Sequence, residues 1–207
     1  MITLPELRSL VTHNAYDIEK YLRNLHTALS NALNIDYSFA SGYGLTPISN
    51  PTGFANWPNV AATSGTDTTP ANGTQFVTSI FVPVNKTITN INYLIGSVGG
   101  TDKVYGVLYS STGTVLANTD LTGGGATVGT AANIQTLALT ATYAAKGPAL
   151  FYVGISMNGT TARLRTVPAH TQQGLVGNTV SQTHGSVAAI TPPATFTADK
   201  APVVFLN

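Results

Sequence analysis

The first part of the chain carries apolar side chains at a spacing of seven residues. One row begins at Leu4 and a second row begins three residues later, at Leu7. These are the a and d positions of a heptad repeat, and the pattern continues without a break over residues 3–36. It predicts one N-terminal α-helix that associates with other helices. The positions expected at the helix–helix contact are Leu4, Leu7, Val11, Asn14, Ile18, Tyr21, Leu25, Ala28 and Ala32.

The width of the apolar face favours a trimer over a dimer. Leu22 and Leu29 extend the face beyond the two rows, which is wider than a two-stranded seam requires. Asn14 occupies a d position, where a buried amide would fix the register and the oligomeric state; in a frayed coil the same side chain would be solvated. Two alternatives remain for this helix, namely docking on a different protein and folding back onto the rest of its own chain.

Residues 37–74 have neither a helical nor a strand period. Prolines interrupt them repeatedly, and a long segment without regular structure is uncommon inside a compact domain. The segment is therefore a linker or an extended arm. Its aromatic residues favour the arm, because a flexible linker would be polar. The residues expected to contact a partner are Phe39, Tyr43, Phe54 and Trp57.

Residues 75–207 alternate short apolar-rich runs with turn residues, which predicts an antiparallel β-domain of the sandwich or jelly-roll class. Two turns are marked most clearly: Ser110–Gly113, with a glycine at its end, and Asn158-Gly159, a strong hairpin signal. The residues between Thr166 and Val203 give a looser pattern. The expected strands are Gln75–Pro83, Thr87–Val98, Lys103–Tyr109, Thr114–Asn118, Asn133–Thr140, Ala149–Met157, Thr160–Thr166 and Val203–Leu206.

The composition argues against several classes of function. Charged residues make up 8% of the chain, against about 25% in ordinary soluble domains. The net charge of +1 does not indicate binding to nucleic acid or to an anionic membrane. No apolar stretch is long enough to span a membrane. We therefore expect neither partner. There is no cysteine, so thiol catalysis and cysteine-based zinc sites are excluded. A threonine-rich, charge-poor surface indicates contact with other proteins, although many all-β extracellular or particle proteins share this composition.

No group of residues has the spacing of a catalytic or metal site. His13 and His26 are thirteen positions apart on the predicted helix, and His170 and His184 lie in loop-like segments, where a surface role is expected. The acids of the β region are Asp102, Asp120 and Asp199. The segment Gly154–Asn158 approaches a nucleophile elbow, but a strand is expected to continue through it. The glycines of residues 123–129 do not match a dinucleotide fingerprint. We therefore expect no catalytic residue, no metal and no cofactor.

Binding functions have two candidate surfaces. Arg163 and Arg165 point to one face of the same predicted strand and form the only local cluster of charge, which would meet a carboxylate or a partner protein, or simply be an exposed strand face. The tyrosines offer rings that a sugar would stack on, although tyrosines in strands are more often half-buried. They are Tyr93, Tyr105, Tyr109, Tyr143 and Tyr152.

Several runs of the β region together resemble a β-sandwich module of tailed-bacteriophage virion proteins, the accessory kind that decorates heads or forms short fibres. They are Gly100–Asn118, Leu139–Pro148, Phe151–Ala162 and Pro193–Ala198 with Ala201-Pro202. The resemblance covers about residues 75–207 and does not include the predicted helix. It implies a non-catalytic protein on the exterior of the virion.

The resemblance and the heptad pattern together favour a trimeric capsid decoration or head-fibre protein that anchors on the shell. Its expected partners are further copies of itself and the major capsid protein or another virion protein. The alternative is a tail-fibre or receptor-binding module that recognises a glycan on the host surface.

Overall fold

The computed structural model describes residues 24, 54–55, 65–169 and 175–207. The chain divides into two compact units, Met1–Thr46 and Pro47–Asn207. The described part of the second unit is mainly β, and every pairing between its described strands is antiparallel, which confirms the prediction of a mainly antiparallel β-domain. The predicted helix over residues 3–36 lies outside the described residues apart from Asn24, whose backbone is helical.

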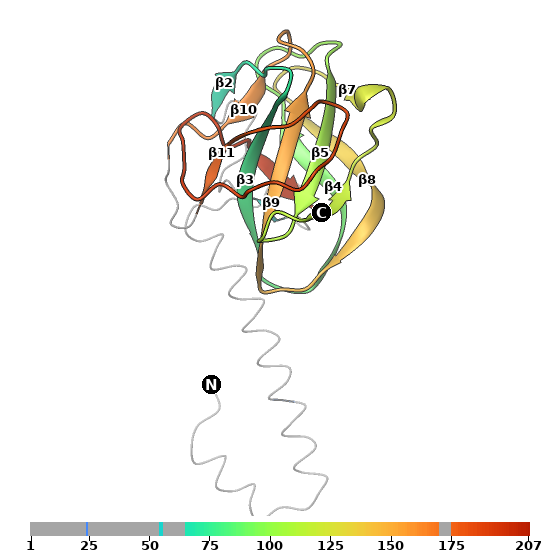
Figure 1. The fold of residues 1–207 in the computed structure, drawn as a ribbon, viewed down its shortest axis with the longest axis vertical. Coiled ribbons are helices and arrows are strands. Elements are labelled where there is room, and N and C mark those ends of the chain that lie inside the picture. Colours follow the sequence, from blue (N-terminus) through green and yellow to red (C-terminus); the bar gives the residue numbers. More distant parts are fainter. Residues whose placement is uncertain (1–23, 25–53, 56–64, 170–174) are drawn as a thin grey trace, which may run out of the picture. The chain divides into compact units, whose positions relative to one another are not determined.

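The larger sheet has six strands, in the order β11-β3-β9-β5-β6 with β7 also paired to β5 (Figure 1). Apart from the local β5–β6 hairpin, the strands of the main path pair with strands that are distant in sequence, so the sheet is held mainly by long-range pairing. Its strands are β3 (Thr74–Val82), β5 (Lys103–Tyr109), β6 (Val115–Asn118), β7 (Ala126–Thr127), β9 (Ala149–Met157) and β11 (Gly177–Ser181).

The second sheet has four strands in the order β1-β12-β4-β8. They are β1 (Phe54–Ala55), β4 (Lys86–Leu94), β8 (Ile134–Ala145) and β12 (Val204–Leu206). A bridge between Thr119 and Leu139 connects the two sheets along one side. A separate pair joins β2 (Thr66–Thr68) to β10 (Leu164–Thr166).

The main core lies between the two sheets and comes from the period-2 alternation of their strands. Alternate residues of β3 and β9, such as Ile80 and Val153, meet Ile91 and Tyr93 of β4, and all four are almost fully buried. The outward side of β8 is exposed and uncharged. Its exposed residues are Ile134, Thr136, Ala138, Thr140, Ala141, Thr142 and Ala144.

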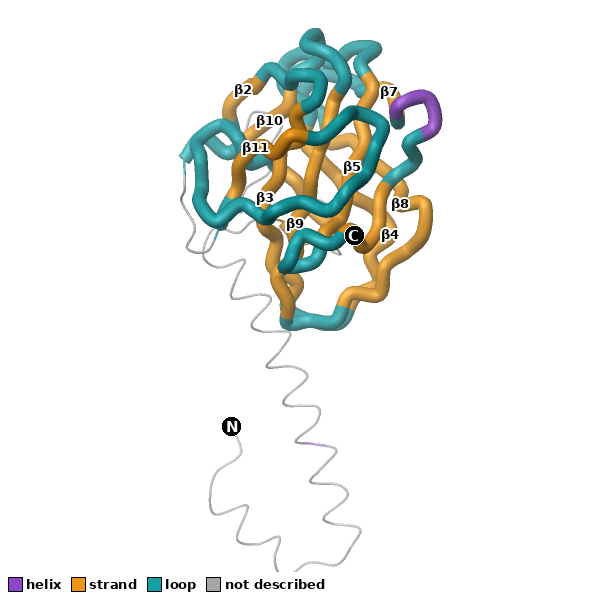
Figure 2. The backbone as a smooth tube through the Cα atoms, viewed as in Figure 1, coloured by secondary structure: helices purple, strands orange, loops and turns teal. Residues whose placement is uncertain are grey.

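The outer face of the six-stranded sheet is covered as well. The C-terminal segment between β11 and β12 crosses over β3, β9 and β5 (Figures 1 and 2). Val187 and Ile190 of this segment pack on a second cluster that contains Val77, Tyr105 and Tyr109. Burial on both faces explains why β5 is apolar along nearly its whole length, without the alternation of a half-exposed strand.

The first predicted hairpin is confirmed. The N–H of Ser110 donates to the carbonyl of Thr114 at 2.8 Å, and β5 pairs with β6 across the turn. Gly113 has φ +85°, a conformation that a side chain would strain. A Cβ at Gly113 would also collide with the carbonyl of Ile190, so the turn and the C-terminal segment fit closely together.

The second predicted hairpin is wrong, because β9 and β10 do not pair. The amide oxygen of Asn158 accepts the N–H of Lys103 at 2.7 Å, and the Asp102 carboxylate accepts the N–H groups of Thr161 and Ala162 at 3.0 and 2.8 Å. These bonds fold the chain after β9 against the start of β5. As a consequence the chain leaves the six-stranded sheet, and β10 pairs with β2 instead.

The structure differs from the sequence prediction at other places as well: β4 ends at Leu94 and not at Val98, β10 begins only at Leu164, and the short β7 was not predicted. The segment 37–74, predicted to be irregular, contributes β1 and β2, because its short runs find partners in β12 and β10. The loose region before the last strand contains β11, which adds an edge to β3. β8 continues to Ala145, past the predicted end at Thr140, because its last residues pair with the start of β4.

Candidate functional site

The predicted arginine pair lies beside a carboxylate. Arg165 on β10 is directly opposite Asp67 on β2, and its Nη1 lies 3.2 Å from Asp67 Oδ1. The backbone N–H of Ser97 donates to both carboxylate oxygens, at 2.9 and 3.1 Å. Three separate segments of the chain therefore converge on Asp67.

The electrostatics of this group favour a charged Asp67. Partial burial raises the pKa of its carboxyl group, but the hydrogen bonds from Ser97 and the charges of Arg165 and Arg163 outweigh it, so that the pKa lies below its usual value. Arg163 Nη1 also donates to the carbonyl of Thr161 at 3.0 Å. Both arginines are half-buried and already bonded within the domain. Their contact with a partner stays a prediction.

A serine and a histidine lie within hydrogen-bond distance on the outer face of the six-stranded sheet. Ser156 Oγ of β9 is 3.1 Å from His184 Nδ1. The other ring nitrogen, Nε2, is 2.7 Å from the carbonyl oxygen of Gly124, in the 3₁₀ turn Thr122–Gly124. Since a carbonyl only accepts, Nε2 is the donor in its contact with Gly124. The His184 ring also packs against Tyr105, with centroids 5.0 Å apart.

This serine–histidine contact stabilises the fold and does not have the exposure of a nucleophilic pair. A nucleophilic serine must reach its substrate, whereas Ser156 is fully buried beneath the C-terminal segment. β9 runs straight through Ser156, as predicted for the segment Gly154–Asn158. The expectation that His184 has a surface role is wrong: the ring is half-buried and joins the C-terminal segment to both β9 and the loop before β7.

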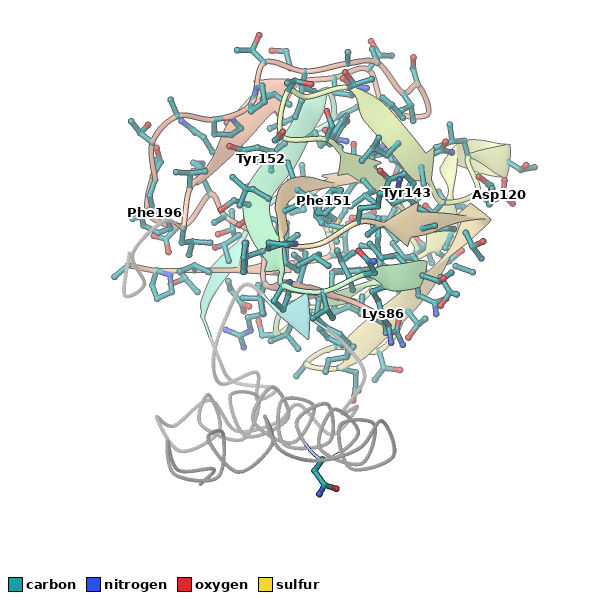
Figure 3. All side chains as sticks on the ribbon, turned by 90° about the horizontal axis from the view of Figure 1, so that it is seen from below. Lys86, Asp120, Tyr143, Phe151, Tyr152 and Phe196 are labelled. Carbon is teal, nitrogen blue, oxygen red and sulfur yellow. The ribbon has the colours of Figure 1, made fainter. Side chains whose placement is uncertain are left out.

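Two of the remaining acids hold loops in place. Asp102 accepts the two N–H groups after β9, as described above, and Asp120 Oδ1 accepts the N–H of Thr122 at 2.8 Å. Hydrogen bonds from Thr122, and to a smaller extent from Leu121, hold the pKa of the exposed Asp120 below its usual value. Asp120 lies at the edge of the molecule in Figure 3. Neither arrangement is the paired-carboxylate geometry of hydrolysis.

Four of the five tyrosines are more buried than the sequence indicated, and Tyr143 is half-buried as expected. Tyr93, Tyr105 and Tyr109 are fully buried, and desolvation raises the pKa of each phenol. Tyr152 is almost fully buried on the outer side of β9, and Figure 3 shows it on the opposite side of that strand from Phe151. Tyr143 is half-buried with its ring edge against Phe151. These rings stabilise the two cores and do not form an exposed platform for a sugar.

One buried polar contact had no signal in the sequence. Gln75 is fully buried on the outer face of the six-stranded sheet, where the hydroxyl of Tyr109 donates to its Oε1 at 2.8 Å. Its side chain lies across Gly154, and a Cβ at that glycine would come within 2.5 Å of it. Gln75 Nε2 has no hydrogen-bond partner among the described residues. Only the pairing of β3 with β9 brings Gln75 to this glycine.

Of the remaining predicted contact residues, the structure describes the backbone of Phe54. Phe54 is in β1, whose backbone pairs with β12. The oligomerisation positions from Leu4 to Ala32 and the arm residues Phe39, Tyr43 and Trp57 lie outside the described residues, as does His170. Among the residues that the structure does describe, no group of three or more histidine or acidic side chains is placed to hold a metal ion, and no helix is long and apolar enough to cross a membrane.

No model of a protein family matches this chain, and no curated protein matches its sequence.

Proposed function

We propose that this chain is a non-catalytic structural protein of a tailed-phage virion: a trimeric capsid decoration or head-fibre protein that anchors on the outside of the shell. One observation carries the proposal. Asp67, Asp102 and His184 use their polar groups in hydrogen bonds or ion pairs that hold separate segments of the module together. The outward face of β8, in contrast, carries only threonine, alanine and isoleucine at its exposed positions.

An uncharged, exposed strand face suits a protein that works against other subunits. Desolvating threonine and alanine costs little compared with desolvating lysine or glutamate, so such a face is readily covered by protein. The family resemblance of residues 75–207 supports the same assignment. We infer that the two sheets form a β-sandwich, because their inner faces share one core.

The proposed mechanism is mechanical. The heptad helix joins three copies, and the aromatic arm, with Phe39, Tyr43, Phe54 and Trp57, contacts the shell or a neighbouring subunit. Arg163 and Arg165 add a charged contact at the β2–β10 pair. The sandwich then projects from the shell or bridges adjacent capsid subunits, and its double-sided core makes it rigid enough for that role.

The test is the copy number of this chain in purified particles. Quantitative mass spectrometry against the major capsid protein gives the ratio, with a tail protein of known stoichiometry as the internal control. A decoration protein is expected at a copy number comparable with that of the capsid protein. A copy number as low as that of the tail protein would contradict the proposal and favour a receptor-binding module.

A further inference from the structure

The chain contains the tripeptide Asn-Gly-Thr twice, at Asn72-Gly73-Thr74 and at Asn158-Gly159-Thr160. Both asparagines are exposed. An asparagine that precedes glycine is able to react with its own backbone, because glycine has no side chain that obstructs the approach of its nitrogen to the neighbouring amide carbon. Since the two copies have the same local sequence and are both exposed, a difference in their reactivity has to come from the fold.

The first copy lies in an open turn directly before β3. The N–H of Thr74 closes this turn by donating to the carbonyl of Ala71 at 3.1 Å. Gly73 has φ +80°, which glycine adopts without strain, and a Cβ built on it would meet nothing within 4 Å.

The peptide group between Asn72 and Gly73 is free to rotate. Within the described part of the chain, neither this peptide group nor the Asn72 side chain has a hydrogen-bond partner. Turns that differ in the orientation of their central peptide share the hydrogen bond that closes them, so the rotation leaves that bond in place. The Gly73 nitrogen is therefore able to reach Cγ of Asn72 without unfolding of the module.

The second copy is fixed by hydrogen bonds and by close packing. Asn158 Oδ1 accepts the N–H of Lys103 at 2.7 Å, and the N–H of Asn158 donates to the carbonyl of Lys103 at 3.1 Å. The Asp102 carboxylate lies against Gly159, so close that a Cβ on this glycine would collide with it. The negative charge of this carboxylate also opposes loss of the proton from the Gly159 nitrogen, which the reaction requires.

From this contrast we propose that Asn72 is a site of spontaneous deamidation in the folded chain, and that the fold protects Asn158. The Gly73 nitrogen attacks Cγ of Asn72 and forms a bond with it. The bond from Cγ to the side-chain nitrogen then breaks, and ammonia leaves with the proton of the Gly73 N–H. Water opens the resulting succinimide ring at either carbonyl, which gives aspartate or isoaspartate. One water is consumed for each ammonia released, and nothing is oxidised or reduced.

The modification changes the charge of the chain and one edge of the six-stranded sheet. Either product adds a negative charge, which cancels the formal net charge of +1. Isoaspartate also lengthens the main chain directly before Gly73, whose carbonyl accepts the N–H of Gln182 at 3.0 Å. Gln182 is buried where the C-terminal segment leaves β11. Hydrogen exchange at Gln182 is therefore expected to be faster in the isoaspartyl form than in the unmodified chain.

The test compares the two asparagines within one sample. The full chain is incubated in mildly alkaline buffer made with heavy-oxygen water, so that each newly formed carboxylate carries the label, and peptide mass spectrometry gives the rate at each site. A second sample in concentrated urea, which removes the fold, is the matched control. We expect the reaction at Asn72 to be several-fold faster than at Asn158 in the folded chain, and the two rates to be similar in urea.

A variant tests the source of the protection. Asp102→Ala removes the carboxylate beside Gly159 and is expected to accelerate the reaction at Asn158 several-fold, while the rate at Asn72 and the β-sheet signal in circular dichroism stay unchanged. An unchanged rate at Asn158 in the folded variant would overturn the protective role of Asp102.

Two results with the native chain would overturn the proposal itself. The first is a rate at Asn72 that is equal to or lower than the rate at Asn158 in the folded chain. The second is a difference that persists in urea, because it would come from the sequence and not from the fold. Neither result bears on the proposed function, since the reaction requires only this chain and water.

Discussion

The carboxylate of Asp67 faces two arginine side chains and one backbone N–H, and its pKa is lowered as a result. A carboxyl group with a lowered pKa in the folded state stabilises the fold above the unfolded value, which is 3.8 for this group. That stability is lost as the pH falls through the lower folded pKa. The charge of Asp67 therefore makes the stability of the β2–β10 pair depend on pH only in the strongly acidic range.

Asp67→Asn is expected to lower the free energy of unfolding at pH 7 by about 1 kcal/mol, because a partly buried arginine loses its counter-charge. The difference from the native chain should shrink as the pH falls below 3.8, where Asp67 itself becomes neutral. Urea unfolding at pH 7 and at pH 3 measures both values. A difference of equal size at the two pH values would show that Asp67 acts through its shape and not its charge.

Gly154→Ala tests the fit of Gln75 across the sheet. A methyl group there would come within 2.5 Å of the buried Gln75 side chain, so the variant is expected to lose about 1–3 kcal/mol of unfolding free energy. Gly100→Ala is the matched control, because its nearest neighbour would lie at an ordinary 3.6 Å. Equal stability of the two variants in urea would mean that Gln75 moves aside freely.

At the scale of elements, the C-terminal segment is held on the six-stranded sheet by a few polar contacts. His184 bonds to Ser156 and Gly124, and Tyr105 donates to the carbonyl of Ser186 at 3.0 Å. Val187 and Ile190 add apolar contact with the outer cluster. The segment therefore has both a specific anchor and a less specific apolar cover.

Removing the anchor should loosen this segment before the rest of the domain. His184→Ala deletes two hydrogen bonds and leaves the buried Ser156 hydroxyl without its imidazole partner, a loss of about 1–3 kcal/mol. Hydrogen exchange should accelerate at Ile190, whose N–H donates to the carbonyl of Gly113, while amides of β9 keep their protection. Ser186→Ala is the control, because its carbonyl acceptor stays in place. Unchanged exchange in His184→Ala would contradict the anchoring role.

The sequence predicted those elements whose signals are local. Lys103–Tyr109 and Ala149–Met157 were predicted with the bounds that the structure gives them, because each is an apolar run between clear turn residues. The pairing of β10 with β2 could not be predicted, since it joins residues almost a hundred positions apart. Asn158-Gly159 gave the wrong answer because the Asp102 carboxylate captures the following N–H groups, a long-range contact that outweighs the local turn preference.

The sequence identified several residues of the candidate site but not the contacts between them. The sequence singled out Arg163, Arg165, Ser156 and His184, but it did not show that Asp67 lies opposite Arg165 or that His184 reaches Ser156. The first contact depends on the pairing of β10 with β2, and the second on the segment after β11 that carries His184 across the sheet. The burial of Tyr105, Tyr109 and Tyr152 was underestimated because the C-terminal segment, which covers their face, has no regular pattern of its own.

At the scale of the whole molecule, the proposal concerns assembly. The described module has two cores and an uncharged outer face on β8. Each of these features suits a rigid unit held in a larger particle. The assembly itself depends on the heptad rows of residues 3–36, and the whole account depends on their forming a trimer.

The mass of the full chain in solution tests this claim most directly. Sedimentation equilibrium is expected to give three times the chain mass of 21.4 kDa, and one chain mass for the variant that combines Ile18→Asp with Leu25→Asp. Two aspartates at a positions would bury charge in the helix contact, which the trimer cannot tolerate. The double variant should keep the β-sheet signal in circular dichroism. A monomeric native chain, or a trimer that the two aspartates leave intact, would contradict the account.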